Sequence, residues 1–457
     1  MRKLIKRLFF REKLCDLRAQ SVCVGHLAVC KLLFMANIAL KYGKTVVPFE
    51  FDETQFEVLG RFYESAPLSD VELGERFDAP INSKTLEEII QPNETVLIVV
   101  PDATRQTACG QIVNLLVRRL IANGTMPFEI NIIFATGIHR RVTEDEKREI
   151  LTPFIVQRIK TLEHNAKDWL ALAGLDSDRF ANFGEINNSP VELNKVLTEY
   201  DHVITVGGVS FHYFAGFTGG RKLICPGLAS EKTIAATHKL AFDCETKTRR
   251  EGVGTGKLKG NAVHEAFVEV ASNVKPSFSF NAIVNEKGEA VEMFCGDWIA
   301  SHEKACEVYA ENHTIEINEK RDVVVVSCGG FPHDLNLIQA HKALESASKA
   351  CKDGGQIIFL AECADGLGRN DFLKWFETKN SADLAEILCE NYEVNGQTAW
   401  SLLRKNENFD VRVITSLADE ETRRMRMNPA RSFDEIVIDK AKKGYILPFG
   451  AKVFVKN

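Results

Sequence analysis

The sequence predicts an α/β protein with two domains, mainly parallel sheets and an active-site cleft between the domains. Short apolar runs that suit buried strands alternate with amphipathic helical patterns along the chain. Several of these runs end in polar or glycine-rich turns, which is where open parallel sheets bind ligands. The chain has 457 residues, of which 45% are apolar, more than one core usually accommodates.

Two series of strands and helices carry this prediction. In the first series, strands are expected at 95–100, 129–136 and 201–208, with helices at 106–122 and 144–173. In the second, strands are expected at 321–330, 355–362, 410–417 and 445–455, with helices at 335–351 and 381–404. A polar stretch at 313–320 separates the series. We therefore expect an N-terminal domain over 35–315 and a C-terminal domain over 316–457.

Residues 1–34 look unlike the rest. Their basic start resembles that of a signal peptide, but charged residues at 11–13 and 16 interrupt the apolar run, and no small-x-small cleavage site follows. The later apolar stretch is too short to span a bilayer. We expect the natural product to begin at Met35 and residues 1–34 to be a non-native or disordered extension. The alternative is a genuine amphipathic extension.

Charge and cysteine content limit the possible partners. The net charge of −6 argues against a nucleic-acid partner, because such proteins carry a basic stripe. We expect no membrane partner either. The 12 cysteines form no C-x-x-C pair, and Cys109, Cys225, Cys328 and Cys363 lie beside apolar residues or glycine, as small core residues do. This pattern favours a reducing compartment, and hence a cytoplasmic protein.

The segment 207–238 contains the highest density of chemically useful residues. It holds His212, His238 and Lys222, with Lys222 close behind Gly219 and Gly220. Glycines permit tight turns or the close approach of a planar group. Because Leu follows Lys222, the segment is no G-x-x-x-x-G-K-[ST] phosphate loop, and it lacks G-x-G-x-x-G. Glycine content alone is equally compatible with an ordinary loop.

Five motifs occur in order along the chain, most of them at strand ends. They are D-x-T-R (Asp102 to Arg105), A-T-G-x-H (Ala135 to His139), H-x(9)-K (His212 and Lys222), His238 after a Pro-Gly turn, and Q-x-x-K (Gln339 and Lys342). Each motif alone is weak. Together, from Met35 onward, they resemble the lactate racemase family of nickel-pincer enzymes.

This resemblance implies a nickel-dependent racemase or epimerase of lactate or a related 2-hydroxyacid. The family's cofactor is the nickel pincer pyridinium-3-thioamide-5-thiocarboxylic acid mononucleotide, and Lys222 matches the lysine that tethers it covalently. His238 matches the single protein ligand of nickel, which suits soft sulfur donors and imidazole. Asp102, Gly219 and Gly220 are expected near the cofactor, although Asp102 could instead orient Arg105.

The resemblance also assigns the substrate contacts. His139 and His212 match the pair of bases, one for each enantiomer, that accompany hydride transfer, and imidazole titrates near neutral pH. Arg105, Gln339 and Lys342 match the residues that hold the substrate carboxylate. The implied partners are a small-molecule 2-hydroxyacid and the proteins that synthesise the cofactor and insert nickel.

Some residues depart from the family pattern. Tyr213 and Phe214 follow His212 where many relatives carry Pro, and Thr237 precedes His238 where many carry Asn. These differences leave the substrate open, with a sugar acid or malate as alternatives to lactate. Trp375 and Trp400 are the candidates for the family's pocket tryptophan.

Two other functions remain open from the residues alone. An NAD-type hydroxyacid dehydrogenase would suit the alternating pattern, but the expected glycine motif is missing. A non-catalytic protein that binds a mononucleotide or hydroxyacid would not need both His139 and His212.

Overall fold

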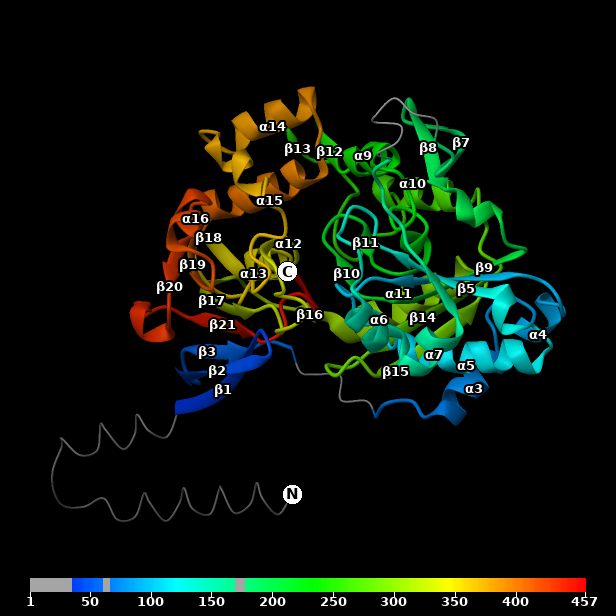
Figure 1. Cartoon of the computed structure of the whole chain (residues 1–457). Coiled ribbons are helices and arrows are strands. Elements are labelled where there is room, and N and C mark those ends of the chain that lie inside the picture. Colours follow the sequence, from blue (N-terminus) through cyan, green and yellow to red (C-terminus); the bar gives the residue numbers. More distant parts are fainter. Residues whose placement is uncertain (1–34, 61–65, 169–176) are drawn as a thin grey trace, which may run out of the picture.

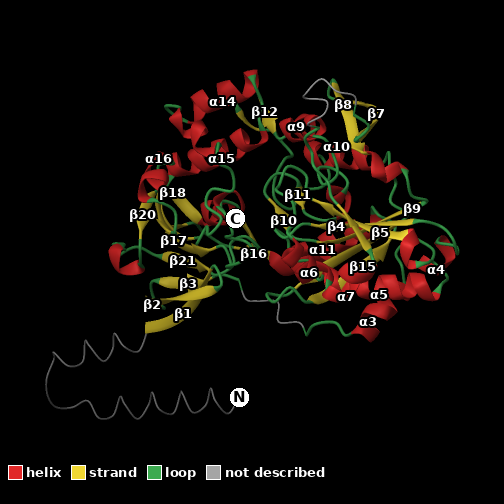
Figure 2. Cartoon of the chain, in the orientation of Figure 1, coloured by secondary structure: helices red, strands yellow, loops and turns green. Residues whose placement is uncertain are grey.

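The structure is a computed structural model that describes residues 35–60, 66–168 and 177–457. The extension expected at 1–34 lies outside the described residues. Figure 1 shows two α/β lobes side by side, and Figure 2 shows strands inside each lobe with helices around them. The predicted fold class is confirmed.

The N-terminal lobe is built on a six-stranded sheet in the order β15-β14-β9-β4-β5-β6. All neighbouring strands run parallel except β14 and β15. Its strands are β4 (Val96–Pro101), β5 (Ile130–Ala135), β6 (Lys160–Leu162), β9 (His202–Gly208), β14 (Phe278–Val284) and β15 (Ala290–Gly296). Separate apolar clusters pack the two faces of this sheet, because its central strands are buried on both sides.

The C-terminal lobe has a six-stranded, entirely parallel sheet in the order β20-β19-β18-β17-β21-β3. Its strands are β3 (Phe56–Val58), β17 (Arg321–Ser327), β18 (Cys351–Leu360), β19 (Asp410–Ile414), β20 (Asn428–Ala430) and β21 (Gly444–Leu447). Val324, Val326 and Phe359 lie on one face of this sheet, within the largest apolar cluster of the lobe.

The first described strands belong to the C-terminal lobe. The hairpin β1 (Met35–Tyr42) and β2 (Thr45–Asp52) packs Leu40 and Phe49 onto the C-terminal sheet, and β3 pairs with β21. The sequence pattern predicted that this segment belongs to the N-terminal domain, 35–315. The placement differs because strand pairing between residues almost 400 positions apart leaves no local pattern.

Several predicted helices are interrupted. The helix expected over 144–173 is α6 (Glu144–Leu151), then α7 (Pro153–Arg158), then β6, because Pro153 begins a new helix after Thr152 at positive φ. Residues 169–176 of that prediction lie outside the described residues. The second-lobe predictions divide likewise into α12 (Leu337–Ala340) and α13 (Ala343–Ala350), α14 (Ser381–Glu390) and α15 (Val394–Asn408), and β21 and β22 (Phe454–Lys456).

The remaining elements surround these sheets. In the N-terminal lobe they are α3 (Asp70–Asp78), α4 (Leu86–Ile89), α5 (Cys109–Ala122), η1 (Pro127–Glu129), β7 (Phe180–Ile186), β8 (Ser189–Asn194), η2 (Lys195–Thr198), β10 (Phe211–His212), β11 (Gly216–Phe217), η3 (Gly220–Leu223), α9 (Glu231–Lys239), β12 (Phe242–Asp243), β13 (Thr248–Arg249), α10 (Ala262–Ala271) and α11 (Ala300–His313). The others are β16 (Thr314–Glu316), η4 (Phe372–Glu377), α16 (Asp419–Arg424) and η5 (Phe433–Glu435).

The described cysteines fall into two groups. Cys109, Cys225, Cys328 and Cys363 are free and buried, as predicted for small core residues. Cys244 and Cys389, which the sequence analysis did not single out, form a disulfide. In the described part of the chain, every helix is too short or too polar to cross a lipid bilayer.

Candidate active site

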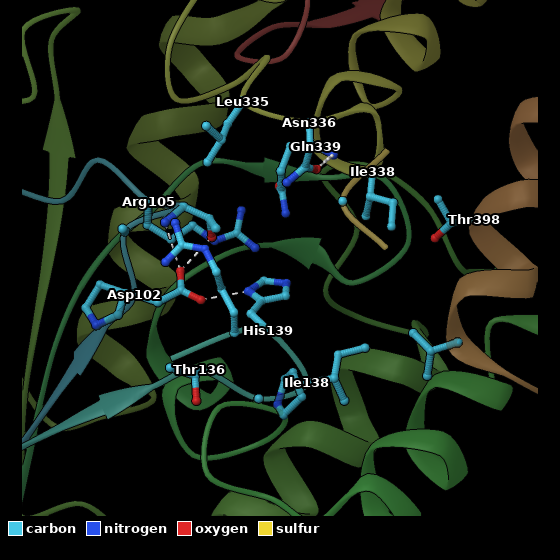
Figure 3. Close-up of a pocket in the computed structure, with 18 of the residues that line it drawn as sticks. Asp102, Arg105, Thr136, Ile138, His139, Leu335, Asn336, Ile338, Gln339 and Thr398 are labelled. Carbon is cyan, nitrogen blue, oxygen red and sulfur yellow. Dashed lines mark hydrogen bonds and ion pairs between the residues drawn. The ribbon is translucent and has the colours of Figure 1, made fainter. Parts of the chain in front are cut away.

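A cleft of about 760 Å³ lies between the two lobes. It is lined by nine of the ten predicted site residues, namely Asp102, Arg105, His139, His212, Gly219, Lys222, His238, Gln339 and Lys342. Figure 3 shows Asp102, Arg105 and His139 together on one wall, with Gln339 above them on another segment. The structure therefore brings both lobes' motifs to one cavity.

Sheet topology explains this convergence. Strand β4 lies between β5 and β9. The chain leaves β5 toward β6 on one side of the sheet and leaves β9 toward β14 on the other. The connections therefore diverge beside the end of β4, where Asp102 follows. His139 follows β5, and His212 lies on β10 just after β9. In open parallel sheets, such a switch point leaves a crevice beyond the carboxyl ends of the strands.

Asp102 orients His139. The Nδ1–H of His139 donates to Oδ2 of Asp102 over 2.7 Å, while Thr104 donates to Oδ1 through its backbone N–H and its hydroxyl. Burial alone would raise the pKa of Asp102, but the contacts with His139, Thr104 and Arg105 lower it to about 2. With Nδ1 protonated, a neutral His139 presents the Nε2 lone pair as a base.

His212 has the opposite hydrogen-bonding pattern. The backbone N–H of Ala215 donates to its Nδ1 over 3.3 Å, so a neutral imidazole carries its proton on Nε2. Burial holds its pKa well below the usual range, and the nearby cations Lys222, Lys342 and Arg105 lower that pKa further. The cleft therefore holds one imidazole arranged to accept a proton and one arranged to donate.

His238 is arranged as a neutral metal ligand. Its Nδ1–H donates to the carbonyl of Ile234 one turn earlier in α9, over 2.8 Å, which leaves the Nε2 lone pair free. Burial and the charge of Lys222 lower its pKa to about 3. Within the described residues, no three His, Cys, Asp or Glu side chains gather as a metal site. His238 is therefore not part of a cluster of such side chains in the described residues.

Lys222 reaches the cleft through an aromatic pair. Its Nζ lies 5.7 Å from the ring centre of Phe214 and 5.2 Å from that of Phe267, and both rings also contact His238. Burial, together with Arg105, Arg221 and Lys342, holds its pKa well below the usual range. Such an amine is neutral more readily than an exposed lysine and can act as a nucleophile.

Gly219 and Gly220 shape the loop that carries Lys222. Both have positive φ, and a Cβ at Gly219 would lie 2.9 Å from the carbonyl oxygen of Gly208. A Cβ at Gly220 would lie 2.5 Å from the ring of His302, and Gly220 does not line the cleft. Tight packing inside the lobe therefore requires glycine at position 220.

Arg105 and Lys342 form a cationic site at the cleft. In the described part of the chain, neither has a carboxylate within ion-pairing distance; Lys342 donates instead to Oε1 of Gln339. Burial, and repulsion between the two positive charges, hold the pKa of Lys342 well below its usual range. A bound carboxylate would relieve this repulsion and accept two parallel N–H donors from Arg105.

The residues that depart from the family pattern, and the two candidate tryptophans, differ in whether they line the cleft. Tyr213 lines it, stacked on His212 with ring centres 5.4 Å apart, and its hydroxyl lies 3.3 Å from Oγ1 of Thr398. Thr237 is fully buried and donates to the carbonyl of Thr233 inside α9. Trp375 and Trp400 do not line the cleft; both pack in the C-terminal core.

Two residues at the site have no recognisable sequence signal. Phe267 lies on α10, away from every strand-end motif, and helical spacing marks it only as a core residue. Thr398 on α15 faces the cleft from the other lobe (Figure 3). No signal in the sequence distinguishes either residue from its neighbours.

Comparison with known proteins agrees with this geometry. The family described as "Lactate racemase N-terminal domain" matches residues 42–249, and "Lactate racemase C-terminal domain" matches residues 317–454. The lactate racemase of Thermoanaerobacterium thermosaccharolyticum is 28% identical over 93% of this chain and 100% of its own length. That of Lactiplantibacillus plantarum is 29% identical over 92% of this chain and all of its own.

Solved structures show the same arrangement. The lactate racemase apoprotein from T. thermosaccharolyticum superposes with a TM-score of 0.81 at 27% identity, covering 92% of this chain and 100% of that one. A protein from Thermotoga maritima superposes with a TM-score of 0.65 at 19% identity, covering 86% of this chain and all of its own. The second likeness supports the fold alone.

Proposed function

Because the chain belongs to the lactate racemase family, whose members are isomerases, we propose that it is a nickel-dependent racemase or epimerase of a 2-hydroxyacid. One observation carries this proposal. Two imidazoles of opposite hydrogen-bonding pattern, His139 and His212, line the same cleft as an unpaired cationic site and a buried lysine. A protein that only binds a ligand needs no such pair, and a dehydrogenase would need a dinucleotide motif that the chain lacks.

The cleft suits a nickel pincer mononucleotide held by Lys222 and His238. A lysine of lowered pKa suits a thioamide tether, and an imidazole with a free Nε2 suits a fourth donor beside sulfur and carbon. The scarcity of other metal donors among the described residues is consistent with a cofactor that supplies them. When bound, this cofactor supplies an acceptor for the hydride on the carbon that bears the hydroxyl group.

The side chains of the cleft position the substrate. Arg105 binds the carboxylate with two N–H donors, and Lys342 adds a second positive charge. Gln339, which accepts from Lys342, holds the ammonium in place. The anion also offsets the cations that lower the pKa of His212, so binding makes that imidazole a better base.

His139 and His212 move the hydroxyl proton. For one enantiomer, His139 accepts it at Nε2 while Asp102 stabilises the imidazolium that forms. For the other, His212 accepts it after its neutral ring turns over or changes tautomer. Because the product of one direction is the substrate of the other, the two side chains exchange the roles of base and acid.

The proposal also covers the cellular location, the partner proteins and the substrate. A cytoplasmic location gives access to 2-hydroxyacids and to the proteins that synthesise the cofactor and insert nickel. Lactate is the simplest substrate, while the hydroxyl groups of Tyr213 and Thr398 at the cleft wall would suit a more polar acid such as malate or a sugar acid.

Intact-protein mass spectrometry of material from a cofactor-producing host tests the proposal. We expect a mass increase that maps to the peptide containing Lys222, together with racemisation of at least one 2-hydroxyacid. Lys222→Arg should lack both, whereas Lys232→Arg, on the exposed part of α9, should keep both. An unmodified Lys222 in protein that racemises a hydroxyacid would refute the tether.

A further inference from the structure

A short hairpin of the N-terminal lobe inserts into the C-terminal lobe. It consists of β12 and β13, joined by a turn at 244–247, and lies between α14 and α9 in Figure 1. Phe242, at its start, is only 3% exposed and belongs to the core of the C-terminal lobe. Its ring packs edge-on against Trp400 on α15, with ring centres 5.0 Å apart.

A buried ionic contact fixes the other end of the hairpin. Arg249 donates to both carboxylate oxygens of Glu345 on α13, over 2.6 and 3.2 Å, and Lys405 on α15 donates over 2.9 Å. Burial alone would raise the pKa of Glu345, but the two cations hold it well below its usual range. The hairpin is therefore anchored to two helices of the opposite lobe.

The tip of the hairpin carries a covalent contact. Cys244 is bonded to Cys389 on α14, and Lys247 pairs with Glu386 one turn earlier on the same helix. Cys244 is exposed and Cys389 is half-buried, so small thiols in solution reach the bond. The seven free cysteines of the described residues are all buried. Among the cysteines of the described residues, Cys244 and Cys389 are therefore the ones that reagents in solution can reach.

The hairpin is connected directly to the candidate active site. Helix α9, which carries His238, ends at Lys239, and Phe242 follows three residues later. Tyr213, the neighbour of His212, contacts His341 and Thr398 across the same interface. Because the cleft lies between the lobes, contacts that hold the lobes together also control how far it opens.

We propose that Cys244 and Cys389 are a reversible redox site that fastens the hairpin to α14 and restricts opening of the cleft. In oxidation, the two thiols lose two electrons and two protons to a low-molecular-weight disulfide, which becomes two thiols. A small thiol reverses the exchange and releases the hairpin tip. Exposed disulfides are the ones that exchange readily, and in reducing compartments such bonds are usually transient or regulatory.

This inference does not depend on the proposed function, because it is tested on the full chain without cofactor. The protein is equilibrated with oxidised or with reduced glutathione, and peptide mapping measures the Cys244–Cys389 bond. Cleft access is then measured as the acetylation rate of Lys222 by a small activated ester. We expect acetylation to be roughly tenfold or more slower in the oxidised protein, which corresponds to a shift of about 1.4 kcal/mol in the opening equilibrium.

Variants separate the bond from other effects of oxidation. Cys244→Ser and Cys389→Ser should acetylate at one rate in both buffers, the rate of the reduced parent. Cys351→Ser, which removes a buried free cysteine, should keep the redox response. Equal rates for the oxidised and reduced parent would overturn the proposal. So would a failure of the linked peptide to form, or a redox response that persists in Cys244→Ser and Cys389→Ser.

Discussion

His139 and Asp102 are joined by a hydrogen bond between two strand-end turns, with 2.7 Å between Nδ1 and Oδ2. The carboxylate is 4% exposed, whereas the imidazole reaches the cleft. Because a buried carboxylate accepts and cannot donate when ionised, it fixes the proton of a neutral His139 on Nδ1. This contact makes Asp102 a partner of the proposed base, while its charge also acts on Arg105. Whether Asp102 also binds the cofactor stays a prediction.

Asp102→Asn should greatly reduce racemisation without preventing cofactor attachment. An amide can donate to Nδ1 and so stabilise the tautomer in which Nε2 is protonated, which removes the base. We expect turnover to fall by about 10²–10⁴-fold, the usual contribution of a general base. Racemisation rate and the mass of the Lys222 peptide are the two measurements. Thr104→Val, which removes one hydrogen bond to Asp102, should have a smaller effect; full activity in Asp102→Asn would contradict the assignment.

The sequence was informative about strand ends. The apolar runs before Asp102, His139 and His212 are buried strands, and parallel packing brings their carboxyl ends to one edge of the sheet. Their convergence was therefore predictable from pattern alone. The pairing of Asp102 with His139 was not, because it depends on turn geometry between residues 37 positions apart.

Contacts between distant segments explain the other differences. The pairing of β3 with β21 and the anchoring of Arg249 by Glu345 join segments whose local patterns carry no trace of each other. Phe267 likewise has the spacing of an ordinary core residue on α10, yet its ring flanks Lys222 and His238. Such positions become visible only when the lobes are assembled.

Arg105→Lys should weaken substrate binding, although the substitution keeps the positive charge. Lysine keeps the charge but loses the planar pair of donors, and a hydrogen bond to a charged group contributes about 1.5–3 kcal/mol. We therefore expect KM for the hydroxyacid to rise by roughly tenfold or more. Steady-state kinetics with each enantiomer measures this change. Arg140→Lys is the control, since that guanidinium also lines the cleft but is paired with Glu146; equal effects of both variants would contradict the role of Arg105.

His238→Ala should lower nickel retention and leave the fold intact. The substitution removes the one proposed protein donor, whereas the tether at Lys222 remains. Nickel per protein, measured by elemental analysis after gel filtration, should fall while the mass of the Lys222 peptide stays raised. His264→Ala is the matched control, because His264 is also buried in this lobe but does not line the cleft. Unchanged nickel content in His238→Ala would show that another residue binds the metal.

Acid should destabilise the protein well above the pH at which carboxylates titrate. Burial lowers the pKa of His164 to about 4 and those of His238, His264 and His341 to about 3, from an ordinary value of 6.5. Below pH 6.5 the unfolded chain thus binds more protons than the folded one, so the free energy of unfolding falls as pH falls toward 3. Urea unfolding of the apoprotein between pH 7.5 and 5 measures the slope.

A single substitution isolates one of these groups. His264→Gln removes one titrating site, so its free energy of unfolding should depend less on pH than that of the parent, by up to about 1.4 kcal/mol per pH unit. A parent protein whose stability is constant from pH 7.5 to 5 would show that these imidazoles are not buried in the neutral form.

Removal of either His139 or His212 should abolish net racemisation but preserve half of the reaction in a handed way. Each enantiomer presents its hydroxyl group to one of the two imidazoles, and a complete turnover needs both. With His139→Ala, one enantiomer should still yield keto acid in a single turnover; with His212→Ala, the opposite enantiomer should do so. Loss of one base costs about 10²–10⁴-fold in rate, so the asymmetry should be large.

The handedness is measured by mixing each nickel-loaded variant with each enantiomer of several 2-hydroxyacids and following keto-acid formation in single turnovers. His264→Ala controls for the loss of a buried histidine outside the cleft. Loss of both half-reactions in one variant and of neither in the other would mean that one imidazole serves both faces of the substrate, and racemisation at the parent rate in both variants would exclude both as bases. If no hydroxyacid yields keto acid with the nickel-loaded parent, the cleft binds a hydroxyacid or mononucleotide without turning it over.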